Sequence, residues 1–173
     1  MIINDSFPKF DLPIDFIADD SITGDILNYY SNFPCKIKAG VFVLCTEGMV
    51  KATINLLEVV IRKNDFVIVL PNSFIQIHEV SSDTRISFAG FSSDFMLSGN
   101  YVEILLDYMH LILNSHVISL QDDIAGLYRN VYLLLIRAYT LPHSLENKDI
   151  IRSILAIFLQ GTKELYKRYG RKL

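Results

Sequence analysis

This sequence contains few cysteines. It also shows neither a secretion signal nor a membrane anchor. Cys35 and Cys45 are the two cysteines; they form no CxxC pair, which favours reduced thiols in a cytoplasmic protein. The first residues, MIINDSFPKFD, lack the basic and apolar regions of a secretory signal. The longest apolar run, around residues 131–136, is far too short to cross a bilayer. We therefore expect a cytoplasmic protein with no membrane partner.

Positive charge is also scarce, except at one end of the chain. Residues 163–173 carry five basic groups and one acidic group, whereas the net charge of the chain is −3, so the other 162 residues sum to −7. An acidic body is a poor match for nucleic acid, whose binding depends on neutralising phosphates. The basic end complements the dipole at a helix C-terminus, or it begins a linker to a nucleic-acid-binding part that is absent here.

Sequence signatures of catalysis and metal binding are missing. The chain has no GxSxG, P-loop, GxGxxG or kinase motif. No two of its four histidines share an HxH, HxxxH or HxxxE spacing on one element, which argues against a metal site. They are His78, His110, His116 and His143. We therefore predict no cofactor and no enzymatic activity.

What the sequence does contain is a set of short apolar runs separated by turn residues. At 173 residues, with 51% hydrophobic and 20% charged, one compact unit is expected. Residues 1–34 have no clean periodicity and predict an arm with short strand pieces. Strands are expected at 41–46, 49–56, 59–61, 66–70, 74–80 and 85–91. No helical crossover interrupts them, so we predict antiparallel pairing in a sandwich or barrel.

After Ser92 the apolar spacing becomes helical. Helices are predicted at 101–114, 121–139 and about 145–169, with Ser144 as a weak cap of the last one. The middle of the second helix, VYLLLI, is apolar nearly all round and must be covered on more than one side. The predicted fold class is α+β, with an antiparallel barrel followed by about three helices. Its segments are an arm with the first barrel strand or strands (1–34), a barrel core (35–92) and a helical region (93–173). Within the first segment, Tyr29-Tyr30 and Phe33-Pro34 are expected to begin the barrel.

The stretch NDFVIVLPNSFIQIHEV, residues 64–80, contains the candidate binding site. Strand alternation places Phe74, Gln76, His78 and Val80 on one face and the two isoleucines on the other. Gln76 and His78 would then orient a small ligand inside the barrel, or they are ordinary core residues with satisfied hydrogen bonds. Phe74 and Cys45 complete the candidate ligand-binding set, although a buried strand cysteine is usually only packed core.

The run GVFVLCTEGMVKATINLLEVVIRKNDFVIVLPNSFIQIHEV resembles the core of the cupin, or jelly-roll, barrel. Metal-dependent cupins place two histidines and a glutamate ahead of this core and a histidine after the Pro-led turn. Here the upstream segment CKIKAG has neither histidine nor glutamate, and Gln76 occupies the later histidine position. The resemblance therefore implies a metal-free barrel.

With an arm before the barrel and helices after it, residues 25–170 resemble the N-terminal effector-binding half of bacterial AraC-type transcription regulators. The phrase DFVIVLPNSFIQIHEVSSD and the segment FAGFSSDF carry this likeness. It implies a small-molecule effector, a homodimer formed by the helices, and DNA contact only through a C-terminal helix-turn-helix half, which this chain lacks. The candidate dimer residues are Leu127, Val131, Leu134 and Leu135.

Two alternatives stay open. One is a small cupin enzyme, isomerase- or oxygenase-like, which uses unusual ligands or no metal. The other is a structural barrel filled by its own side chains. The sequence does not choose an effector: Lys36 and Lys38 could meet an acidic group, but solvation explains them equally well.

Overall fold

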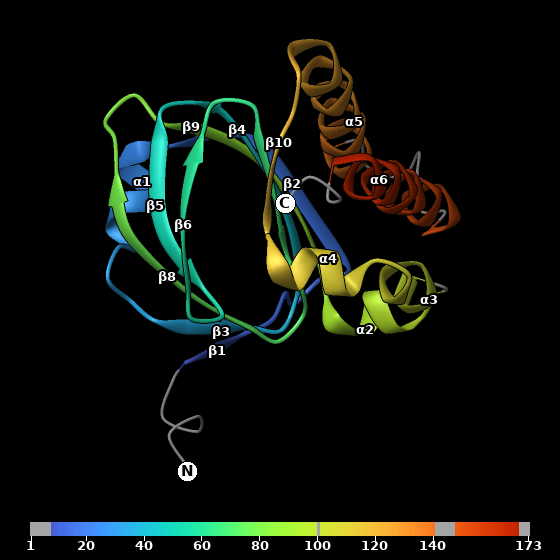
Figure 1. Ribbon diagram of the computed structural model, residues 1–173. Helices are drawn as coiled ribbons and strands as arrows, with labels where there is room; N and C mark the ends of the chain where they lie inside the picture. Colours follow the sequence, from blue (N-terminus) through green and yellow to red (C-terminus); the bar gives the residue numbers. More distant parts are fainter. Residues whose placement is uncertain (1–7, 100, 141–147, 170–173) are drawn as a thin grey trace.

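The structure, a computed structural model, describes residues 8–99, 101–140 and 148–169 (Figure 1). The elements of this part of the chain are β1 (Lys9–Phe10), β2 (Phe16–Thr23), α1 (Gly24–Tyr29), β3 (Cys35–Ile37), β4 (Gly40–Glu47), β5 (Met49–Ile54), β6 (Leu57–Arg62), β7 (Asp65–Val69), β8 (Ser73–Val80), β9 (Arg85–Phe91), α2 (Ser93–Leu97), α3 (Tyr101–Leu106), α4 (Met109–Asn114), β10 (Val117–Ser119), α5 (Asp122–Thr140) and α6 (Lys148–Tyr169).

Two sheets face each other and form the barrel. The first sheet has the strand order β1-β3-β8-β5-β6, and the second has the order β10-β7-β4-β9-β2. Neighbouring strands are antiparallel except β1 and β3, which pair in parallel. The helices after β9 lie on the outer side of the second sheet (Figure 1). The predicted α+β fold class, an antiparallel cupin-like barrel followed by helices, is confirmed.

The central strands of the second sheet are buried on both faces, and β4 shows how its sequence allows this. Val41 and Val43 point into the barrel, while Phe42 and Leu44 point to the helices. A strand that is apolar at every position suits a sheet covered on both sides. Strand β7 repeats the pattern, since all five of its residues are buried.

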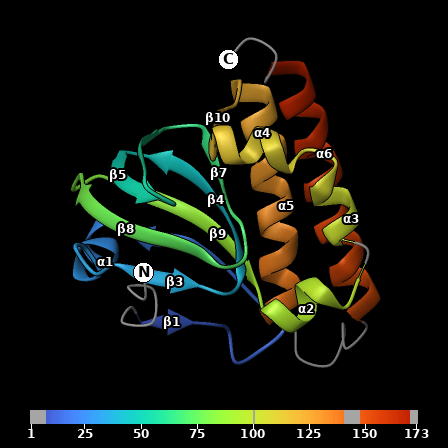
Figure 2. The ribbon, with the colours of Figure 1, turned by 60° about the horizontal axis from the view of Figure 1, so that its bottom comes forward.

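Aromatic side chains join this sheet to the helices. Phe158 of α6 stacks on Phe42 and Phe66 with ring centroids 6.0 and 6.1 Å apart, and it meets Tyr132 of α5 edge-on at 5.1 Å. Tyr132 also donates a hydrogen bond from its hydroxyl to the Phe42 carbonyl at 2.8 Å. Figure 2 shows α5 against the barrel with α6 beside it. Such aromatic pairs contribute about 0.5–1.5 kcal/mol each beyond their buried area.

The helical region differs from the prediction in two places. The predicted helix at 101–114 is two short helices, α3 and α4, because the chain breaks at Asp107 and Tyr108. Asp107 pairs with Lys163 at 2.7 Å, and the buried Tyr108 donates its hydroxyl hydrogen to the Leu159 carbonyl at 3.0 Å. Strand β10, which was not predicted, then pairs with β7. Ser119 at its end donates to the Asp65 carboxylate at 2.6 Å. Ser144 lies outside the described residues.

The tight turns at the two ends of β5 both contain residues with positive φ. Gly48 has φ +83° as its predicted turn requires, and a Cβ there would lie 2.5 Å from the Thr84 Cα. Strand β5 ends at Ile54 rather than at Leu56, because Asn55 and Leu56 have φ +49° and +71° and form the two-residue hairpin turn.

The arm is more ordered than its sequence suggests. Strand β2 pairs with β9 along the edge of the second sheet, from Phe16 opposite Phe91 to Thr23 opposite Arg85. A short helix, α1, follows directly and was not predicted. The Gly24 N–H at its start donates to the Thr84 carbonyl at 2.9 Å, which ties the arm to the β8–β9 turn.

His116 is a buried polar residue that the sequence did not single out. It is 1% exposed, and its Nδ1 donates to the Ile68 carbonyl at 3.1 Å. The Ile68 N–H in turn donates to the His116 carbonyl at 3.1 Å, so His116 extends the edge of the second sheet. Among the described residues its Nε2 has no partner. Burial lowers the pKa of His116 below 6.5, and the hydrogen bond to Ile68 opposes this only in part.

We predict that the protein loses stability through His116 as the pH falls below about 6.5. Its folded pKa is depressed, so below 6.5 the unfolded chain binds a proton that the folded protein excludes, with a slope of up to about 1.4 kcal/mol per pH unit. His116→Asn keeps an amide donor near the Nδ1 position and does not titrate. Urea unfolding between about pH 5 and pH 7 should show a smaller slope in this variant. Equal slopes in the two proteins would contradict the assignment.

Candidate functional site

A cavity of about 680 Å³ lies between the two sheets. Its volume falls within the range of about 300–1,000 Å³ that is typical of ligand pockets. The first sheet lines it with Ile37, Ala52, Ile54, Ile61, Ile75 and Ile77, and the second with Val41, Val43, Val67, Val69, Ile86 and Phe88. These side chains alternate along their strands, so each strand gives the cavity one apolar face.

The mouth of the cavity is formed by α1, the chain that joins it to β3, the start of β3, and β1. Side chains from these segments line the cavity: Phe10, Leu27, Tyr29, Tyr30, Phe33 and Cys35. Several are largely exposed, Tyr29 by 79% and Phe33 by 67%, so this is where the cavity meets solvent. The Asn32 N–H donates to the Ile77 carbonyl at 2.7 Å and anchors the segment to β8.

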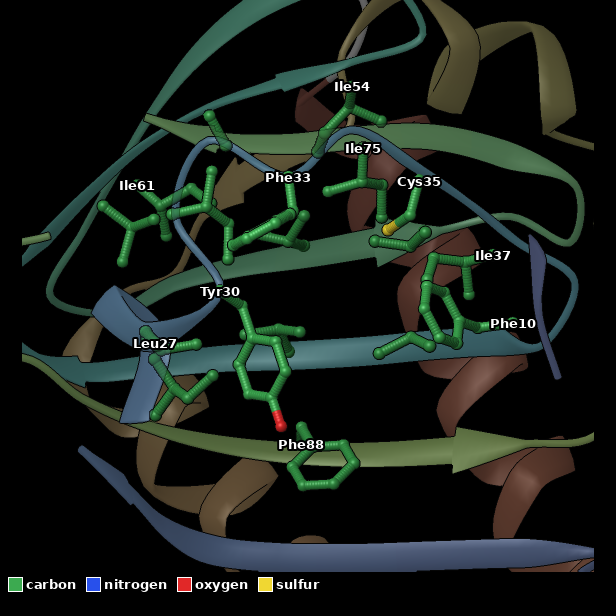
Figure 3. A pocket seen from close by; sticks show the side chains of 18 of the residues that line it. Phe10, Leu27, Tyr30, Phe33, Cys35, Ile37, Ile54, Ile61, Ile75 and Phe88 are labelled. Carbon is green, nitrogen blue, oxygen red and sulfur yellow. The ribbon is translucent and has the colours of Figure 1, made fainter. Parts of the chain in front are cut away.

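The Tyr30 hydroxyl is a polar group of this mouth that points inward. Figure 3 shows the Tyr30 side chain reaching into the cavity, with its hydroxyl directed toward Phe88 on the opposite sheet. Cys35 adds a half-buried thiol, and burial raises the pKa of this thiol, which keeps it protonated near neutral pH.

The structure places the candidate polar pair on the other side of β8. Ile75 and Ile77 line the cavity, whereas Phe74, Gln76 and His78 do not. Their surroundings are external: His78 is exposed and hydrogen-bonds Thr53 Oγ1 at 2.6 Å, and Lys36 lies 5.4 Å from the centre of the Phe74 ring. The predicted ligand-binding role of these residues is therefore not supported by their position.

A bulge in β8 explains why one predicted face is split. Lys51 faces Glu79 and Ala52 faces Ile77, so the β5 pairing leaves out His78 as an extra residue. Beyond this bulge Val80 turns inward and joins the apolar cluster of Ile75 and Ile77. The strict alternation assumed from the sequence would have kept Val80 with the outer residues.

Cys45 lies in the barrel core but not at the cavity. It is fully buried, and its thiol donates to the Glu47 carbonyl at 3.2 Å. Burial, reinforced by the Asp65 carboxylate, raises the pKa of Cys45 to about 11. The thiol is therefore protonated at neutral pH and acts as a small packed side chain.

The candidate dimer residues divide between an exposed and a buried face of α5. Leu127 is 59% exposed, Leu134 is 51% exposed, and Val131 between them is half-buried. Leu135 is completely buried in the helical core, so it is corrected from a contact residue to a core residue. The three others form one stripe at helical spacing.

The residues missed by sequence reasoning are those at the mouth, chiefly Leu27, Tyr30 and Phe33. They lie within residues 1–34, whose lack of periodicity gave no orientation for their side chains. The aromatic residues of this segment were expected to dock, because aromatic rings are costly to leave in water, and Tyr29-Tyr30 and Phe33-Pro34 were expected to begin the barrel, but none was assigned to the site.

The described residues contain neither a cluster of metal-binding side chains nor a helix that could span a membrane. No group of three or more His, Cys, Asp or Glu side chains in this part of the chain is placed to hold a metal ion. Within the same part, no helix has the length and apolar character needed to span a bilayer.

A second hollow of about 420 Å³ lies between the Pro71 corner and α2–α4, lined in part by Met96 and Met109.

No protein-family model and no curated protein sequence matches the chain. Among solved structures it is similar to ToxT from Vibrio cholerae, with 12% identity and a TM-score of 0.45 over 90% of this chain and 58% of ToxT. Unsaturated fatty acid bound wild-type ToxT gives 12% identity and 0.43 over 92% and 57%. The Clostridium difficile EutQ protein gives 15% and 0.33 over 47% of this chain and 72% of EutQ.

This chain thus spans less than two thirds of the length of the ToxT chains. ToxT is an AraC-family regulator, and likeness at this level assigns no family to the present chain. At these identities the likeness concerns the fold alone.

A pair of matched substitutions tests whether the cavity is empty space. Ala52 faces the cavity, and Ala89 on β9 is packed against the helices with no exposed surface. We predict that Ala52→Phe leaves the free energy of unfolding unchanged or raises it, because the ring fills the cavity. Ala89→Phe should lower it by about 1–3 kcal/mol or more, since overpacking strains a dense core. Urea unfolding measures both, and equal losses would show that the barrel interior is filled.

Proposed function

We propose that this chain is the ligand-sensing and dimerisation domain of an AraC-type transcription regulator, and that it binds a small effector inside the barrel. The observation that carries the proposal is the cavity of about 680 Å³ enclosed by the two sheets. A core of this size would pack without such a void if the barrel were only structural, because protein interiors are close-packed. In this proposal, none of the 173 residues contacts DNA.

The composition of the cavity favours binding over catalysis. Its lining contains no His, Asp, Glu, Lys or Arg side chain. The groups there that could take part in chemistry are the Cys35 thiol, whose pKa is raised by burial, and the hydroxyls of Tyr29 and Tyr30 at the mouth. Acid–base or nucleophilic catalysis usually combines such a group with a charged or imidazole partner, and the lining offers none. We therefore favour a non-enzymatic role for the cavity.

The doubly buried sheet offers a route from the cavity to the helices. Val41 and Val43 contact the cavity, while Phe42 between them receives the Tyr132 hydrogen bond from α5. Since close-packed cores transmit small displacements, a ligand pressing on the inner face of β4 would be felt at α5. This coupling is part of the proposal.

Thermal unfolding with a broad panel of sugars, amino acids, carboxylates and apolar compounds tests effector binding. A ligand present at a hundred times its Kd stabilises the folded protein by about 2.7 kcal/mol, which raises the Tm by several degrees. The shift should disappear in Ala52→Phe, whose ring occupies the cavity, and persist in Gln76→Leu on the outer face. A shift lost only in Gln76→Leu would move the site outside the barrel, and a panel without any shift would contradict effector binding.

The proposed dimer contact is the exposed stripe on α5. Leu127 and Leu134 are each more than half exposed, and no described residue covers them. Burying both on two symmetric copies would contribute on the order of 5 kcal/mol before association costs. A two-fold contact needs a self-complementary surface, and a leucine stripe meets this requirement.

We predict that wild-type protein at tens of micromolar is a dimer and that Leu127→Glu/Leu134→Glu is a monomer, because four like charges would face each other at the contact. Light scattering coupled to size exclusion measures the mass. Leu56→Glu/Leu106→Glu is the matched control: it adds the same charge at two other exposed leucines. Dissociation of the control as well, or a monomeric wild type, would overturn the α5 assignment.

A further inference from the structure

We infer that the ligand of the barrel cavity is an uncharged, mainly hydrocarbon molecule with at most one hydrogen-bonding group, which meets the Tyr30 hydroxyl. This inference rests on the proposed sensing function and specifies its ligand class. Four independent features of the described residues lead to it: the side chains that face the cavity, the lack of unsatisfied polar groups there, the position of the polar residues of the first sheet, and the orientation of Tyr30.

The walls of the cavity give a polar ligand nothing to bind. Both sheets contribute aliphatic side chains and Phe88, and no charged or amide side chain belongs to the lining. Strand backbone groups offer little in their place, since β5 pairs with both β6 and β8, and β8 pairs with β5 and, from Ser73 to Ile75, with β3. A hydroxyl or amide of the ligand would therefore lose its water without gaining a partner.

The buried polar groups that lack a partner lie elsewhere. Within the described residues these are His116 Nε2 and Arg152 Nε, and neither residue lines the cavity. A site shaped for a sugar or an amino acid normally leaves such groups waiting for the ligand, because its specificity comes from a few placed polar atoms. This cavity has no such arrangement among its walls.

The polar side chains of the first sheet face away from the cavity and bind each other. His78 bonds Thr53 at 2.6 Å, and Lys51 pairs with Glu79 at 3.3 Å on the outer face. Strand geometry holds these groups on the opposite side from Ile75 and Ile77. These side chains cannot reach the barrel interior by rotating about their own bonds; the strands β5 and β8 would have to separate.

Tyr30 is the exception that limits the ligand to one polar group. Its hydroxyl points toward Phe88 (Figure 3). Tyr30 is 59% exposed and its neighbour Tyr29 is 79% exposed, so Tyr30 directs more of its surface to the interior. A single alcohol, ketone or ether oxygen near the mouth can therefore pair with Tyr30 while the rest of the molecule fills the apolar interior.

The test compares ligands that share one hydrocarbon cage. Isothermal titration of the whole chain with 1-adamantanol, 1,3,5-adamantanetriol and 1-adamantanecarboxylate varies only the polar groups, and 1-decanol and N-phenyl-1-naphthylamine supply two other shapes. We expect at least one uncharged apolar probe to bind, and to lose its binding in Ala52→Phe. On the same cage, the triol and the carboxylate should bind at least about tenfold more weakly, because they bury unpaired polar groups.

A second variant tests the role of Tyr30. Tyr30→Phe should weaken the binding of 1-adamantanol about two- to tenfold and leave 1-methyladamantane unchanged, since only the alcohol loses a hydrogen bond. Equal effects on the two compounds would remove Tyr30 from the inference. Because Tyr30 is more than half exposed, the change to Phe is not expected to disturb folding, which thermal unfolding confirms independently.

The outcomes separate this inference from the proposed function. If a sugar, amino acid or carboxylate binds tightly and loses its binding in Ala52→Phe, the sensing function stands and the ligand class is wrong. If the triol or the carboxylate binds as tightly as 1-adamantanol, the ligand class is also wrong. If no compound of any class binds, both proposals fail.

Discussion

Strand β4 places valines in the cavity and Phe42 and Leu44 against the helices, so the sheet that carries it cannot be solvated on either face. The helices must cover one side, and the first sheet must close over the other. Phe158 meets the first requirement by stacking on both Phe42 and Phe66. The helical layer is therefore a condition for the barrel, because without it a continuous apolar surface would face water.

The same constraint shapes the cavity. Residues that point inward from the second sheet are mostly valines, whereas Phe42, Phe66 and Phe91 turn outward to the helices and Phe88 is the one ring of these strands that lines the cavity. Short side chains on the inner face leave space that Ile75 and Ile77 of the opposite sheet do not fill. The void is thus a consequence of how side-chain size is distributed between the two faces of single strands. Such a distribution can also carry a ligand's effect from one face to the other.

Short runs bounded by turn residues predicted the strands between residues 40 and 91 to within about two residues at each end. Alternation marked β5, whereas a continuous apolar run marked β7. Gly48 was predicted correctly because its turn requires positive φ. The break at Tyr108 was not predictable, because it depends on a partner fifty residues away, the Leu159 carbonyl. Tyr30 and Phe33 were expected to begin the barrel, but their place at the mouth of the cavity was missed, because it arises only when the α1–β3 segment crosses the barrel opening.

Gln76 and His78 lie on the outer face of β8, and the local sequence pattern could not predict which face of the strand points into the barrel. Its two faces are similar in apolar content, with Phe74 and Val80 on one and Ile75 and Ile77 on the other, so alternation alone leaves the orientation undecided. The extra residue at His78 then lets the strand bury Ile75, Ile77 and Val80 together while both polar side chains stay outside. Burying Gln76 and His78 without partners would cost several kcal/mol, and the bulge avoids this cost at the expense of one ladder position. The polar pair therefore marks the outer face of β8, and its exclusion is what leaves the cavity apolar.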